Sequence, residues 1–156
     1  MSWLDRLRRK REPQAIVAEL APFGTMQLDE RVSAWIGEVD WLGAPVTLMI
    51  EQDFDTADAE PALPGARRLF EEAAHWDGVA RAAILRDMPE AAKHWRKPDD
   101  PEWTPEGMLG WLTLRAISAS RDFHQLEYDA GGRLADHSVV VTLDWGKDTA
   151  CAEIHG

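Results

Sequence analysis

The last third of the chain, residues 111–156, most constrains the fold because it has the pattern of four short strands joined by tight turns. Apolar and polar residues alternate in WLTLRAISA, FHQLEYD and HSVVVTLDW, and TACAEI follows as a short fourth run. The glycine pair Gly131-Gly132 and the sequence Gly146-Lys147-Asp148 supply turn residues between these runs. The segment therefore predicts an antiparallel four-stranded meander.

The third of these strands begins with the pair Asp136-His137, which stands out in an aliphatic context. One face of the strand is too apolar to meet water, and we expect it in the core; its members are His137, Val139, Val141, Leu143 and Trp145. In the preceding strand His124, Leu126 and Tyr128 share a face. We expect His137 to head the buried row and to fix the hairpin against His124 and Tyr128.

The N-terminal half contains a second strand signal. Residues 33–52 alternate on both sides of Gly43 and predict a β-hairpin that turns at this glycine. The signal of residues 14–30 is weaker, and Ala15 to Leu20 is compatible with a helical turn or two before Pro22.

The middle of the chain has helical periodicity from Pro64 to Arg96. Pro89 is expected to end the second helix and to open a short third one, PEAAKHWR. Residues 97–105 contain three prolines and predict a stiff connector. Together the segments predict an α+β fold: an antiparallel sheet of about six strands, from the hairpin and the meander, with two or three central helices packed on one face.

Composition limits the class of protein. A chain of 156 residues is about one domain's worth, and a single cysteine, Cys151, excludes an internal disulfide and a thiolate cluster. No apolar run approaches the roughly 20 residues of a membrane span, and no secretion signal is visible. We expect a soluble, cytoplasmic protein that uses no cofactor.

Charge is distributed unevenly along the chain. Residues 1–12 hold five basic and two acidic residues, which gives this segment a net charge of +3. The whole chain has a net charge of −11, so the remaining residues carry −14. A body this acidic repels nucleic acid phosphate, and we therefore expect no nucleic acid partner. Fast association with a basic protein is the partnership that such a surface favours.

The basic leader forms a candidate N-terminal arm of residues 1–12, ahead of a single domain of residues 13–156. Trp3, Leu4 and Leu7 recur at helical spacing, and basic residues that include Arg8 and Arg9 occupy the other side. Such an amphipathic helix is able to lie on an anionic membrane surface or to contact an acidic partner. The alternative is a solubilising arm that packs its apolar residues on the domain.

Three closely spaced carboxylates, Asp53, Asp55 and Asp58, form a candidate binding loop. An EF-hand calcium loop requires Asp or Asn at its fifth position and Gly at its sixth, where Ala57 and Asp58 stand. The segment therefore indicates a solvated acidic loop, and we assign no metal site.

Candidate catalytic residues are His124, Asp136 and His137, which with His155 could supply ligands for zinc or an acid–base group. The sequence lacks the usual metal-ligand spacings, a nucleophile elbow and a phosphate-binding loop. Core histidines are the favoured interpretation. Trp103, in the proline-rich connector, is a candidate interface residue, and a lid packed on the sheet edge is its alternative role.

The segment GEVDWLGAPVTLMIEQD, the Ala-rich helical middle and a meander with Asp136-His137 before alternating aliphatics resemble a group of small uncharacterised bacterial domains of unknown function. The resemblance covers residues 33–156. In that group the late strand usually begins with Gly-His, so Asp136 departs from the pattern. The resemblance implies an α+β fold and no activity, and the size and style are similar to bacterial immunity proteins.

These observations lead to three functional hypotheses. The first is a non-catalytic acidic protein-binding module, immunity-protein-like, that engages a basic protein. The second is a small hydrolase or metal-binding enzyme that uses His124, His137 and Asp136. The third is peripheral membrane association through residues 1–12.

Overall fold

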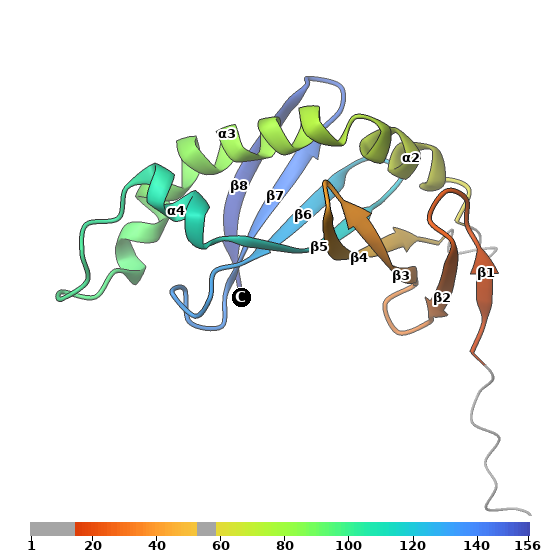
Figure 1. The fold of residues 1–156 in the computed structure, drawn as a ribbon, viewed down its shortest axis with the longest axis horizontal. Helices are drawn as coiled ribbons and strands as arrows, with labels where there is room; N and C mark the ends of the chain where they lie inside the picture. Colours follow the sequence, from red (N-terminus) through yellow and green to blue (C-terminus); the bar gives the residue numbers. More distant parts are fainter. Residues whose placement is uncertain (1–14, 53–58) are drawn as a thin grey trace, which may run out of the picture.

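The computed structural model describes residues 15–52 and 59–156, which form one eight-stranded sheet whose strands lie side by side in chain order (Figure 1). The strands are β1 (Val17–Glu19), β2 (Thr25–Asp29), β3 (Ala34–Trp41), β4 (Ala44–Glu51), β5 (Thr113–Ala119), β6 (His124–Asp129), β7 (Ser138–Asp144) and β8 (Thr149–His155). Neighbouring strands are antiparallel except for β4 and β5, which are parallel.

The parallel pair exists because helices carry the chain back between β4 and β5, as a crossover connection must. These are α2 (Leu63–Glu71), α3 (Ala73–Ala91), the 3₁₀ helix η1 (Ala92–Trp95) and α4 (Pro105–Trp111). The helices lie on one side of the sheet (Figure 1). Within the described ranges, no helix combines the length and apolarity needed to cross a bilayer.

The α+β class is confirmed, but the sheet is larger than the six strands expected. The additional strands are β1 and β2, and Val17–Glu19 is therefore an edge strand where the sequence suggested a helical turn. Ile16 and Val17 are exposed, so β1 has no buried face that would produce alternation. In β2 only Met26 and Leu28 are buried, which is too short a pattern to stand out.

The core lies between the helices and one face of the sheet. A row of buried residues crosses five strands, each residue opposite the next: Leu48, Ile117, Leu126, Val141 and Ala152. Side chains of α3 at helical spacing cover this face: Trp76, Ala80, Ala83, Ile84 and Met88. Burial of each large apolar side chain contributes about 1.5–3 kcal/mol. The predicted buried row of β6 is confirmed, and so are three members of the row predicted for β7: Val139, Val141 and Leu143. His137 and Trp145, which were expected in the same row, lie outside β7 and are half-buried.

Helix boundaries differ from the expectation. The break falls at Glu72, and α3 continues through Pro89 to Ala91, so PEAAKHWR is the last turn of α3 followed by η1. Pro89 removes one backbone donor near the end of the helix, where few bonds remain to be lost. The Thr104 hydroxyl caps α4 by accepting the Gly107 N–H at 3.1 Å.

The two edges of the sheet differ in how far other residues cover them. At β8 the guanidinium of Arg86 donates to the Ala150 carbonyl at 2.6 Å, and the Asp87 carboxylate accepts the Ala152 N–H at 3.0 Å. Side chains of α3 thus satisfy backbone groups that an edge strand otherwise offers to another chain. At the other edge, Val17 of β1 remains 60% exposed.

Candidate functional site

One face of the sheet, here called the open face, lies opposite the helices and carries none of them in the described part of the chain (Figure 1). A continuous row of mostly small or polar side chains crosses seven strands, each residue opposite the next: Gln27, Ile36, Met49, Ser118, Gln125, Thr142 and Cys151. The amide of Gln125 donates to the Thr142 hydroxyl at 3.3 Å. These side chains form a surface that extends across most of the sheet.

A second row of the open face is acidic. Its members are Glu38, Thr47, Ala116, Glu127, Val140 and Glu153. Glu153 has His155 beside it at 3.4 Å. Glu38 and Glu127 are exposed and make no ion pair with another residue that the structure describes. The charge of this row is therefore left largely uncompensated.

A further carboxylate of the open face lies at the end of β4. Burial raises the pKa of Glu51, and the charge of Asp122 in the β5–β6 turn raises this pKa further. A cation close to a carboxylate favours its ionised form.

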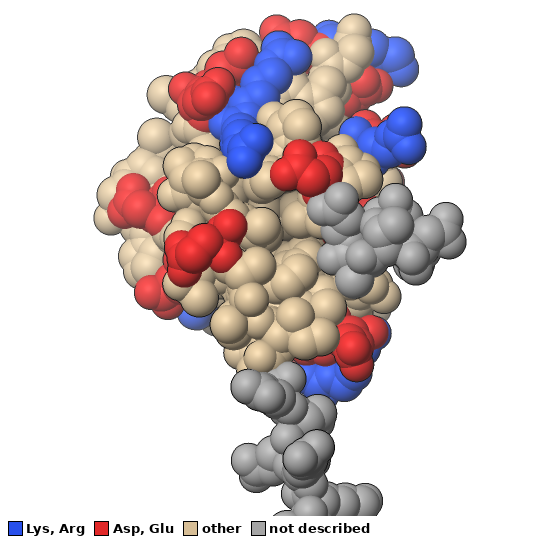
Figure 2. Space-filling view, turned by 90° about the vertical axis from the view of Figure 1, so that its right-hand side faces the viewer, with Lys and Arg blue, Asp and Glu red and all other residues tan. Residues whose placement is uncertain are grey.

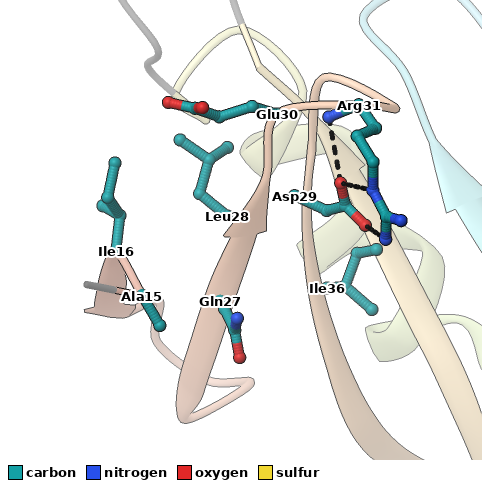
Figure 3. A pocket seen from close by; sticks show the side chains of 8 residues that line it. All are labelled: Ala15, Ile16, Gln27, Leu28, Asp29, Glu30, Arg31 and Ile36. Atoms are coloured by element: carbon teal, nitrogen blue, oxygen red, sulfur yellow. Dashed lines mark hydrogen bonds and ion pairs between the residues drawn. The ribbon is translucent and has the colours of Figure 1, made fainter. Parts of the chain in front are cut away.

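The open face ends at a hollow of about 680 Å³ beside β1 (Figure 3). Its apolar wall includes Ile16, Leu28 and Ile36. On one side Arg31 folds back on Asp29, with Nη2 at 2.9 Å and Nε at 3.2 Å from the carboxylate oxygens. These bonds hold the pKa of Asp29 below its usual value.

Glu30 points away from the Arg31–Asp29 pair in Figure 3, so the rim of the hollow keeps one acidic group that this arginine does not neutralise. Figure 2 looks onto this end of the molecule and shows acidic side chains spread around a largely uncharged centre. Most of the basic side chains in that view lie in its upper part. An apolar hollow with an acidic rim suits a partner that is both apolar and basic.

The structure does not bring the candidate catalytic residues together. His124 lies opposite Leu143, whereas His137 precedes the first residue of β7 at the other end of the hairpin. Six residues of strand separate these positions, which corresponds to about 20 Å. Asp136 is exposed beside His137, and His155 is opposite Ser138 at the same end. No three potential metal ligands cluster among the residues described.

The register of this hairpin explains the separation. A two-residue turn centred on Ala130 and Gly131 would place His124 opposite His137. The connection instead runs from residue 130 to residue 137, and Leu134 within it is fully buried. Burial of Leu134 anchors a long loop in the core. The centre of the hairpin therefore lies three residues later in the chain than a two-residue turn at Ala130 and Gly131 would put it.

His124 is a core residue, only 1% exposed. Burial lowers the pKa of its imidazole to about 4. The ring stands edge-on to Trp145 with centroids 4.6 Å apart, and Nδ1 has no hydrogen-bond partner. On the opposite side, a β-carbon added to Gly65 of α2 would lie 2.9 Å from Nε2. This neutral, enclosed ring has no access to a substrate in the structure.

His137 packs its ring on Trp95 of η1, with centroids 4.4 Å apart, and the expected contact with His124 is absent. Trp103 is partly buried against Trp111, with centroids 5.6 Å apart. The acidic-loop candidates Asp53, Asp55 and Asp58 lie outside the described residues. So do the residues of the arm: Trp3, Leu4, Leu7, Arg8 and Arg9.

Sequence reasoning did not identify the open face as a site. Alternation shows that Gln125 and Glu127 lie opposite the buried side of β6, but it does not show which strands lie beside them. The acidic row forms only because β4 and β5 pair in parallel and join the two halves of the sheet.

Residues 21–154 match the model of a family described as uncharacterized proteins conserved in bacteria (DUF2262), and the chain belongs to this family. The match confirms the resemblance seen in the sequence. No curated protein and no solved structure matches the chain.

Proposed function

We propose that this member of an uncharacterised bacterial family is a non-catalytic module that binds a basic protein through the open face of its sheet. The observation that carries the proposal is the acidic row, in which Glu38 and Glu127 stand exposed and form no ion pair with another residue of the described structure. Carboxylates arranged in this way raise the association rate of a basic partner through long-range attraction.

The dimensions of the open face suit such an interface. Eight strands of three to eight residues, spaced by about 4.8 Å, cover on the order of 800 Å² before the sheet twist is considered. A stable protein–protein interface buries about 800 Å² on each partner. Small side chains such as Ala116 and Ser118 leave this surface accessible to a partner without rearrangement of the sheet.

The hollow beside β1 supplies the apolar component that a charged face lacks. Charge pairs at the exposed rim of an interface contribute little affinity, whereas an apolar side chain in a pocket contributes more. A partner segment would use both the hollow and its acidic rim if it placed an apolar residue between Ile16 and Ile36 and a basic residue beside Glu30.

Affinity purification from the native host at low salt tests the proposal with two matched variants. The first combines Glu38→Gln with Glu127→Gln and removes two charges from the open face. The control combines Glu71→Gln on α2 with Asp99→Asn in the connector, both exposed and without an ion pair among the described residues.

We expect a basic protein that is retained by the wild type and by the control, and lost or weakened at least fivefold with the open-face variant. Its affinity should fall as salt rises. Equal retention by both variants, or no basic protein with the wild type, would contradict the proposal.

An immunity role would make that partner a toxin. This refinement rests on analogy of size and style. A toxin gene adjacent to the gene of this protein, and inhibition of that toxin by it, would support the refinement. An adjacent toxin that neither binds the protein nor is inhibited by it would argue against it. The hydrolase or metal-enzyme alternative gains no support, because His124 and His137 lie at opposite ends of one hairpin.

A further inference from the structure

A cleft lined by three tryptophans is formed by residues of η1, the connector, α4 and the β6–β7 connection. In Figure 1, α4 and the β6–β7 connection lie on the side of the molecule away from β1. Trp95 comes from η1, Trp103 from the connector and Trp111 from the end of α4. The cleft encloses about 580 Å³, within the range of 300–1,000 Å³ typical of small-ligand pockets. All three indoles are only partly buried.

Two cations line the cleft although the chain carries a net charge of −11. Lys97 and Arg133 line it, and Arg96 lines an adjoining hollow of about 510 Å³ that shares Lys97 and Trp103 with the cleft. None of these three cations forms an ion pair with any residue in the described ranges. The guanidinium of Arg133 lies over the ring of Trp111, 5.2 Å from its centroid.

Two carboxylates, Asp100 and Glu102, also line the cleft and balance the formal charge of Lys97 and Arg133, but neither forms an ion pair with these cations. The Asp100 carboxylate accepts the backbone N–H of Lys97 at 2.9 Å and so stabilises the turn that presents this lysine. Glu102 is exposed at the rim between the two hollows. Gly131 and Gly132 also line the cleft and contribute only backbone to its wall.

We propose that this tryptophan cleft binds a nucleotide. The base would stack on the exposed indole faces of Trp103 and Trp95, and the phosphate would contact Lys97 and Arg133. Aromatic rings beside cations are the combination that proteins use to hold a base and its phosphate. An organic cation fits less well, because Arg133 already covers the ring of Trp111.

The occupant is a single nucleotide and not a nucleic acid strand. A polyanion would have to approach a chain whose net charge is −11, and that repulsion grows with each phosphate. The cleft has room for about one base and its sugar. The site is independent of the open face, so the two proposals succeed or fail separately.

Isothermal titration and tryptophan fluorescence with AMP, GMP and UMP test the proposal. Adenosine and inorganic phosphate at the same ionic strength serve as comparison ligands. We expect saturable binding of at least one nucleotide, weaker binding of its nucleoside, and no binding of phosphate alone.

Two substitutions divide the site into its parts. Trp103→Ala should weaken nucleotide binding at least tenfold, in line with the loss of one stacking partner. Because the side chain of Lys97 is exposed, Lys97→Met should leave the fold intact. This substitution should weaken nucleotide binding about tenfold and leave nucleoside binding unchanged. Arg121→Met, in the β5–β6 turn at the opposite end of β6 from the cleft, removes the same charge from an exposed side chain and should change neither.

The proposal is overturned if no nucleotide binds at millimolar concentration, or if Lys97→Met and Arg121→Met bind it equally. Binding of phosphate as tight as that of the nucleotide would show a simple anion site and would also overturn it. Preferential binding of tetramethylammonium or free arginine would do the same.

Discussion

His124 should make the stability of this fold depend on pH between about 4 and 6.5. Its imidazole is 1% exposed, and burial lowers the pKa from 6.5 to about 4. In the unfolded chain the ring regains its ordinary pKa. As the pH falls below 6.5 the unfolded state therefore takes up a proton that the folded state does not bind until the pH approaches 4.

The sign and size of the effect follow from proton linkage. The free energy of unfolding is unaffected by His124 above pH 6.5 and decreases as the pH falls towards 4. A difference of roughly 2.5 pH units corresponds to a loss of about 3 kcal/mol. That is a large part of the 5–15 kcal/mol by which a domain is usually stable.

Urea denaturation at several pH values between 4 and 8 measures the effect, and His124→Leu removes the titrating group. The variant's own stability at pH 7 is not the readout. We expect its free energy of unfolding to decrease between pH 7 and pH 4 by about 3 kcal/mol less than that of the wild type. His155→Gln, which removes an exposed imidazole, should leave the dependence unchanged. The same pH dependence in the wild type and His124→Leu would refute the reasoning.

Three further predictions concern the helices, the acidic face and the arm. Gly65→Ala should destabilise the protein by about 1–3 kcal/mol because its β-carbon would lie 2.9 Å from the His124 ring, whereas Gly78→Ala, with open space around it, should stabilise the protein by about 1 kcal/mol. Thermal denaturation of both variants measures these changes, and a stabilising Gly65→Ala would contradict the packing of α2 against His124. Glu51→Gln should raise the midpoint of thermal unfolding at pH 7, because a raised pKa means that the ionised carboxylate is disfavoured in the folded state. A lower midpoint would refute this expected gain in stability. The same substitution should weaken binding of the basic partner. Deletion of residues 1–12 should reduce flotation of the protein with anionic liposomes if the arm contacts membranes, and unchanged flotation would exclude that role.

The strands that sequence reasoning found are those with a complete local signal. In β6 three buried residues alternate with more exposed ones, β7 is a run of aliphatic residues of which four are buried, and a glycine turn separates β3 from β4. Val17–Glu19 has no such signal, because this three-residue edge strand has only one half-buried residue, Ala18. Its existence depends on pairing with β2, which is a tertiary property.

The site depends on register and strand order, which local patterns do not determine. The buried side chain of Leu134 lengthens the β6–β7 connection, and His124 therefore lies opposite Leu143 at the far end from His137. The tryptophan cleft likewise combines Trp95, Trp103 and Trp111 from three separate segments. Only Trp103 could be selected from the sequence, because its proline-rich context is formed by its neighbours in the chain. The rings of Trp95 and Trp111 come from other segments, and their proximity cannot be recognised from local sequence.

The most direct test of the proposed binding face uses Cys151, the single cysteine of the chain. Cys151 is exposed and lies on the open face opposite Thr142. The measurement is the rate at which iodoacetamide alkylates Cys151, with and without the basic protein recovered by affinity purification. The account predicts that saturating partner slows alkylation at least tenfold in the wild type and in the Glu71→Gln, Asp99→Asn control. An unchanged rate under saturating partner would show that the partner binds elsewhere and would contradict the assignment of the open face.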